Sequence, residues 1–188
     1  MFIQTEQTPN PQTLKFLPGK VVMEEGTAFY QNIDEAGDSP FARRLFGIDG
    51  VIGVFFGSDF ITITKNELFE WQVMKPSVLG GIIDHFNSND KTVEKTISKE
   101  SEKSLAHNDD DSEIVKQIKE LLDTRVRPAV AMDGGDIIYN DFEDGIVYLK
   151  MQGACSGCPS STATLKMGIE NMLKHYIPEV QEVRPVDA

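Results

Sequence analysis

The chain has 188 residues, of which 40% are hydrophobic and 26% charged, so it is long enough for one ordinary domain or two small ones. Its formal net charge of -12 at pH 7 argues against nucleic acid and anionic membranes as partners, because both attract basic surfaces. The first twelve residues match neither a secretory signal nor a transit peptide, and no apolar run approaches the ~20 residues of a membrane-spanning helix. These features predict an acidic protein of cytoplasmic type that does not enter membranes.

The first 87 residues begin with a mixture of short strands and a short helix. Residues 14–16 and 21–23 have strand-like composition and lie on either side of a Pro18-Gly19 turn. Ser39 is expected to cap a helix that continues to residue 46, with Pro40 in its first position, where a missing N–H has no cost.

A hairpin and a second helix complete this part of the chain. Residues 50–56 and 60–64 predict two strands joined by a tight turn. After Pro76 we expect a helix over residues 77–86, with His85 on its solvent side. No metal-ligand spacing and no nucleophile–base pair occurs here, so residues 1–87 are interpreted as a docking or regulatory domain.

Residues 88–111 form a distinct segment. They contain no aromatic residue, no Gly and no Pro, and are rich in Lys, Glu, Ser and Asp. Such a composition buries too little apolar surface to offset the entropy of ordering the chain. We therefore expect a charged linker, flexible or partly helical.

Residues 112–188 predict a second small domain with the element order α-β-β-α-β. Ser112 is a plausible N-cap for an amphipathic helix, which Pro128 should perturb or end. A hairpin turn at Asp144-Gly145 joins strands over 137–142 and 146–151. A helix over 160–176 and a strand near 181–184 follow, which predicts a small sheet with both helices on one face. The fold class expected for the whole chain is α+β.

The two cysteines of the chain, Cys155 and Cys158, form a C-x-x-C pair between the second strand and the last helix of this domain. We expect the helix N-terminus to lower the pKa of the thiols, and Gly153 and Gly157 to let the backbone wrap closely around a bound group. The spacing alone leaves three interpretations open. They are a dithiol redox site, a zinc ion completed by a second subunit, and an iron–sulfur cluster shared by two chains.

Two arguments bear on these interpretations. A redox pair of thioredoxin type usually follows a strand of a βαβ unit, which the first helix and the hairpin of this domain do not provide. His175 is the only nearby candidate for a further zinc ligand, and it lies more than three helical turns from the start of its helix.

Longer motifs resemble a known family. Residues 132–136, the hairpin and residues 153–161 resemble the NifU C-terminal domain of the Nfu family, over about residues 112–185. The first domain resembles the Nfu N-terminal domain in short motifs at residues 8–11, 14–16, 39–42, 59–63 and 71–76.

The resemblance implies an iron–sulfur scaffold or carrier and not an enzyme. Cys155 and Cys158 match the family's ligand positions, so the resemblance implies a [4Fe–4S] cluster, or else a [2Fe–2S] cluster, bridged between two subunits of a homodimer. An upstream scaffold would donate the cluster and apo iron–sulfur proteins would receive it, in the bacterial cytoplasm or in the mitochondrial matrix. We interpret Asp133 and Asp136 as turn residues and not as Mg²⁺ ligands.

Overall fold

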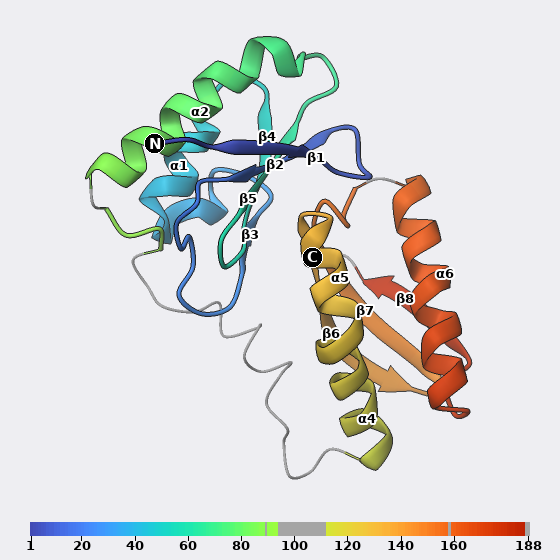
Figure 1. Ribbon diagram of the computed structural model, residues 1–188. Helices are drawn as coiled ribbons and strands as arrows, with labels where there is room; N and C mark the ends of the chain where they lie inside the picture. Colours follow the sequence, from blue (N-terminus) through green and yellow to red (C-terminus); the bar gives the residue numbers. More distant parts are fainter. Residues whose placement is uncertain (89, 94–111, 158, 187–188) are drawn as a thin grey trace. The chain divides into compact units, whose positions relative to one another are not determined.

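The computed structural model describes residues 1–88, 90–93, 112–157 and 159–186, apart from the side chains of Pro159 and Ser161. The chain divides into two compact units, Met1–Ser98 and Lys99–Ala188, each with a β-sheet of its own (Figure 1). Both units mix helices and strands, which confirms the α+β class. The predicted linker over 88–111 lies almost entirely outside the described residues.

The first unit is a five-stranded antiparallel sheet with the strand order β1-β2-β5-β4-β3. Its elements in chain order are β1 (Gln4–Gln7), β2 (Thr13–Leu17), β3 (Ala28–Tyr30), a 3-10 helix (Glu35–Asp38), α1 (Pro40–Phe46), β4 (Val51–Phe56), β5 (Ile61–Lys65) and α2 (Trp71–Ser88). The predicted β4–β5 hairpin is confirmed. So is the cap of α1, where the Ser39 hydroxyl accepts a hydrogen bond from the Ala42 N–H at 3.0 Å.

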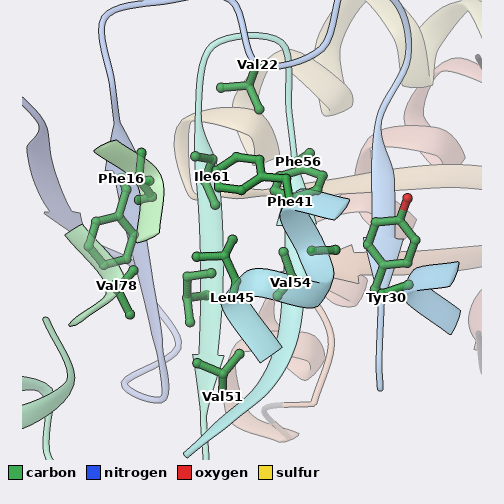
Figure 2. Close-up of a cluster of buried hydrophobic side chains, with 14 of the residues drawn as sticks. Phe16, Val22, Tyr30, Phe41, Leu45, Val51, Val54, Phe56, Ile61 and Val78 are labelled. Carbon is green, nitrogen blue, oxygen red and sulfur yellow. The ribbon is translucent and has the colours of Figure 1, made fainter. Parts of the chain in front are cut away.

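Both α-helices of this unit, α1 and α2, contribute to one hydrophobic core against the sheet (Figure 2). Phe41 of α1 stacks on Phe56 of β4, with ring centroids 5.0 Å apart, while Leu45 and Val78 supply fully buried aliphatic side chains. This core identifies the packed face of the sheet and accounts for the independent compactness of the unit.

The predicted strand at residues 21–23 is wrong. The N–H groups of Val22 and Met23 both donate to one acceptor, the Ser58 carbonyl in the β4–β5 turn, at 2.8 and 3.3 Å. No strand ladder forms there because this stretch is tied to a turn and not to a neighbouring strand. The strand that pairs with β4 on the side away from β5 is β3, a few residues further along the chain.

The helix predicted over 77–86 begins earlier than expected. It starts at Trp71 and contains Pro76, although proline removes one backbone donor from a helix. Tertiary contacts hold this first part in place, because Met74 is 2% exposed and the Trp71 indole N–H donates to the Pro11 carbonyl at 3.3 Å. Burial therefore overrides the local signal for a helix start after proline.

The expectation that His85 is a surface residue is wrong. Its side chain is 2% exposed and its ring stacks on that of Phe41, with centroids 3.8 Å apart and planes 4° from parallel. Its Nε2 atom lies 3.3 Å from the Thr92 hydroxyl, and Val93 packs against the core of the unit. Residues 90–93 thus fold back over the end of α2 and cover the His85 ring, which the helical pattern of the sequence places on the solvent side.

Burial makes this histidine sensitive to acid. Desolvation, followed by the nearby charge of Arg44, lowers the pKa of His85 from 6.5 to about 4. Below pH 6.5 the unfolded chain binds a proton that the folded unit does not, so stability falls as the pH drops from 6.5 towards 4. Between pH 7.5 and 5.0 we expect His85 to lower the free energy of unfolding of the first unit by about 2 kcal/mol.

The measurement is denaturant unfolding at several pH values, followed by tryptophan fluorescence. Trp71 is the single tryptophan of the chain and lies against the core of the first unit, so its signal reports this unit alone. The variant His85→Phe keeps an aromatic ring against Phe41 and removes the titrating group. Equal pH dependence in the two proteins would show that other groups cause the acid sensitivity.

The second unit has a three-stranded sheet in the order β6-β7-β8. Its elements are α4 (Glu113–Leu121), a π-helical turn (Leu122–Val126), α5 (Arg127–Met132), β6 (Gly135–Glu143), β7 (Ile146–Gly153), α6 (Pro159–Tyr176) and β8 (Glu182–Val186). Ser112 caps α4 as predicted, by accepting from the Val115 N–H at 3.3 Å. The β6–β7 hairpin turns at Asp144 and Gly145, both with positive φ, as the predicted turn requires.

Pro128 perturbs the first helix as expected, but does not end it. Figure 1 shows α4 and α5 following each other along one rod, and the wide π turn between them ends at Val126, two residues before Pro128. Proline offers no N–H to the carbonyl of Thr124, and a wide turn accommodates the missing bond.

Both helical segments pack on one face of this sheet, as predicted. One core cluster combines Ile118 of α4, Leu149 of β7 and Leu173 of α6, all fully buried. The strand β8 pairs with β7 in parallel, so that β7, α6 and β8 form a βαβ unit. The expectation that the cysteine pair lies outside such a unit is therefore wrong. The unit forms because β8 pairs with β7 although the whole of α6 separates them in the chain, and local sequence patterns do not indicate such a pairing.

Candidate functional site

The loop between β7 and α6 carries Cys155 and is shaped by glycine at both ends. Gly153 and Gly157 have φ angles of 64° and 80°, a region that disfavours residues with a Cβ atom. Both glycines thus adopt a conformation that suits glycine, while the close wrapping of the backbone around a bound group stays a prediction. Cys155 therefore lies at the end of β7, just before the first turn of α6.

A third glycine, Gly135, lies directly beneath the Cys155 side chain. Gly135 pairs with Gly153 across the β6–β7 ladder. A Cβ atom at position 135 would stand 2.4 Å from the Cys155 sulfur and 2.8 Å from the Gln152 carbonyl oxygen. Any side chain at this position would collide with the thiol, so glycine is required for the site to form as it is.

Hydrogen bonds connect the loop to its neighbours on both sides. The Ala154 N–H donates to the Gly134 carbonyl at 3.1 Å, which joins the loop to the turn before β6. The Thr162 hydroxyl, in the first turn of α6, donates to the Cys155 carbonyl at 3.1 Å. The position of Cys155 is thus set by the turn before β6, which is distant in sequence, and by the first turn of α6, which follows the loop.

The thiol environment differs from the prediction. Cys155 is 5% exposed and belongs to the core cluster of the second unit. Burial, followed by the negative charges of Asp133 and Asp136, raises its pKa to about 12. The expected lowering by the helix N-terminus is therefore wrong for Cys155 in this structure, because desolvation and two carboxylates outweigh the helix end.

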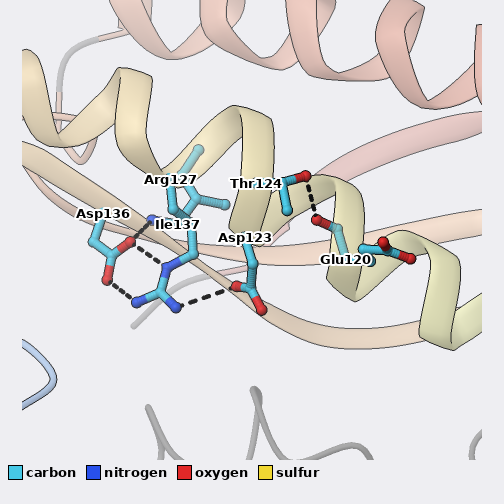
Figure 3. Close-up of polar contacts among 6 residues, drawn as sticks. All are labelled: Glu120, Asp123, Thr124, Arg127, Asp136 and Ile137. Carbon is cyan, nitrogen blue, oxygen red and sulfur yellow. Dashed lines mark hydrogen bonds and ion pairs between the residues drawn. The ribbon is translucent and has the colours of Figure 1, made fainter.

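A buried ion pair supports the strand that carries Gly135 (Figure 3). Asp136 is 4% exposed, and its two carboxylate oxygens accept from Nε and Nη2 of Arg127 at 2.8 and 2.7 Å. The same carboxylate accepts from the Ile137 N–H at 2.8 Å, and Arg127 also donates to Asp123 at 3.3 Å. Asp136 lies in strand β6, so the expectation of a turn residue is wrong for it, and its carboxylate pairs with Arg127.

Two further candidate residues were named from the sequence, Cys158 and His175. Cys158 lies outside the described residues, so its geometry stays a prediction. His175 lies in the last turn of α6, where its ring packs edge-on against Tyr176. Among the side chains that the structure describes, no three His, Cys, Asp or Glu residues gather into a metal site. No helix in the described part is long and apolar enough to cross a membrane.

Two residues that hold the surroundings of Cys155, Arg127 through Asp136 and Thr162 directly, were not found from the sequence. The role of Arg127 had a weak signal, since Asp123 and Arg127 are four residues apart on one helix. The hydrogen bond of Thr162 had no signal in the sequence, because threonine is common in the first turn of a helix and the geometry of the loop decides which carbonyl accepts from it.

Comparison with known proteins identifies the class of the chain. Residues 3–89 match the model of the Nfu/NifU scaffold-protein N-terminal domain, and residues 118–184 match the NifU-like domain. A two-domain protein of this arrangement, with a C-x-x-C loop in its NifU-like domain, is a NifU-type protein.

Curated relatives extend over nearly the whole chain. It is 54% identical over 187 residues to the human protein "NFU1 iron-sulfur cluster scaffold homolog, mitochondrial", covering 99% of this chain and 72% of that protein. It is 53% identical over 185 residues to Arabidopsis thaliana "NifU-like protein 4, mitochondrial", covering 97% of this chain but 65% of that protein. The solution structure of a NifU-like protein from Saccharomyces cerevisiae covers half of this chain at 27% identity, with a TM-score of 0.46. The chain belongs to the Nfu family.

Proposed function

We propose that the protein is an iron–sulfur cluster scaffold or carrier. It holds one [4Fe–4S] cluster between two copies of the chain and transfers it to apo-proteins. The observation that carries this proposal is the ligand count. A cluster of this kind takes four thiolates, and the chain contains two cysteines, Cys155 and Cys158, in one loop. Two chains complete one site.

Sharing the cluster suits a protein that must release its cargo. Ligands divided between two subunits are separated when the subunits part, whereas a cage of four cysteines in one chain would retain the cluster. The name of the human relative, an iron–sulfur cluster scaffold homologue, supports the same function. The names of the human and plant relatives both include the word mitochondrial, which favours a mitochondrial location over the bacterial cytoplasm.

A second candidate is a thiol–disulfide oxidoreductase, which the parallel βαβ arrangement of β7, α6 and β8 favours. The burial of Cys155 opposes it, because an attacking thiolate needs access to its substrate and a pKa near the ambient pH. Zinc bridging two chains is the third candidate and uses the same two cysteines.

Anaerobic reconstitution with iron and sulfide tests these three functions together. We expect about four irons and four sulfides per dimer, with a brown colour, and a mostly monomeric protein before loading. A loaded protein that remains monomeric contradicts the bridged site. Zinc without sulfide in a dimer supports the zinc module, and a colourless monomer that cycles with a dithiol reductant supports the oxidoreductase.

A further inference from the structure

The Cys155 sulfur occupies a defined space, which we call the inward seat. It is the volume over Gly135 that a Cβ atom at that position would fill, 2.4 Å from the sulfur. The side chain in this seat is 5% exposed and forms part of the core of the second unit. The thiol therefore points into the domain and not into solvent.

This orientation is incompatible with sharing a cluster between chains. An iron atom bound at a typical metal–thiolate distance of about 2.3 Å must lie on the accessible side of the sulfur to reach a second subunit. We infer that Cys155 has two positions, an inward seat in the empty carrier and an outward position in which it binds the shared cluster. The outward half of this inference rests on the proposed function, whereas the inward half rests on the described geometry alone.

The loop has the means to turn and the bonds to hold the inward position. Gly153 and Gly157 flank the cysteine with φ angles of 64° and 80°, and glycine moves between backbone regions at little steric cost. Two hydrogen bonds restrict this motion. The Thr162 hydroxyl donates to the Cys155 carbonyl at 3.1 Å, and the Ser156 hydroxyl donates to the Gly153 carbonyl at 2.9 Å. Hydrogen bonds of the loop thus hold the Cys155 sulfur in the inward seat. In this position the empty carrier withholds one of its two ligands from reaction.

Alkylation of the apo-protein measures the inward position directly. In a Cys158→Ala background Cys155 is the only thiol, and its reaction with iodoacetamide is followed by mass spectrometry. We expect the folded protein to react at least roughly tenfold more slowly than the same protein in urea, because a buried thiol reacts only after local opening. Equal rates would overturn the inference.

Two pairs of variants test what holds the thiol inward. Gly135→Ala fills the seat and should bring the alkylation rate close to that in urea. Gly168→Ala, a change in α6 with open space around it, should leave the rate unchanged. Thr162→Val removes the bond to Cys155 and should raise the rate about fivefold, the net effect of one hydrogen bond. Thr164→Val, whose hydroxyl donates to the Ser160 carbonyl at 3.1 Å, is the control.

The outcomes separate this inference from the proposed function. If Gly135→Ala does not fold, the Thr162→Val and Thr164→Val pair decides alone, and equal rates in that pair overturn the inference. In protein with both cysteines, cluster loading should protect Cys155 from alkylation, and release of the cluster should restore the slow rate of the apo-protein. Slow alkylation without any loading would refute the carrier function and retain the inward seat, whereas full loading with a freely reactive apo thiol would do the reverse.

Discussion

The variant Cys155→Ala is expected to lose cluster binding completely while the protein remains folded. Under the proposed function each dimer would lose two of its four ligands, and no described side chain stands ready to replace them. Alanine is the appropriate substitute because Cys155 belongs to the core cluster of the second unit, and alanine removes the sulfur without placing a new polar group there. Iron and sulfide content and the visible spectrum after reconstitution provide the measurement, with circular dichroism to establish folding.

Cys158→Ala should have the same effect, since it removes the second member of the pair. His175→Ala is the control, because it removes the histidine nearest in sequence to the pair but should leave the cluster content unchanged. Retention of a full cluster by either cysteine variant would show that the ligand assignment is wrong. A loss of bound metal in His175→Ala would return zinc with a histidine ligand to consideration.

Loss of the Arg127 guanidinium should strongly destabilise the second unit. Arg127→Ala leaves the Asp136 carboxylate, at 4% exposure, without its ion pair. Breaking a buried pair by removal of one partner costs about 3–5 kcal/mol, because the remaining charge stays desolvated. Hydrogen exchange should therefore show a loss of protection in β6, β7 and α5, while unfolding of the first unit, reported by Trp71, should not change.

A matched surface pair provides the control for this prediction. Arg184 also binds one carboxylate with two nitrogens, at 3.1 and 3.0 Å from the two oxygens of Glu182, but that pair is exposed to solvent. Arg184→Ala should leave the protection of β7 and β8 almost unchanged, since water solvates the charges that remain. Similar losses of protection in the two variants would contradict the role assigned to burial.

The cysteine loop of this protein combines two features that are usually separated. Its place in a βαβ unit is typical of redox dithiols, whereas the burial of Cys155 opposes a redox role. A thiol that is protected when the carrier is empty and available when a second chain approaches would reconcile the two features. The alkylation experiment therefore bears on the oxidoreductase alternative as well, because a redox dithiol must be reactive in the free monomer.

Local signals in the sequence were sufficient for much of the fold. Ser39 and Pro40 begin α1, and Asp144-Gly145 closes the β6–β7 hairpin, because caps and turns depend on a few adjacent residues. The Cys155 loop was also recognisable, since its glycines serve the backbone of their own segment.

Other features were decided by contacts between distant residues. His85 is buried because residues 90–93 fold over it, and Pro76 lies inside α2 because Met74 is held in the core. The Asp136–Arg127 pair and the inward orientation of Cys155 arise only where α5, β6, β7 and α6 meet. The sequence alone therefore determined the candidate cysteine pair, and the tertiary structure decided how Cys155 is held, because burial and charge pairing depend on neighbours that local patterns do not specify.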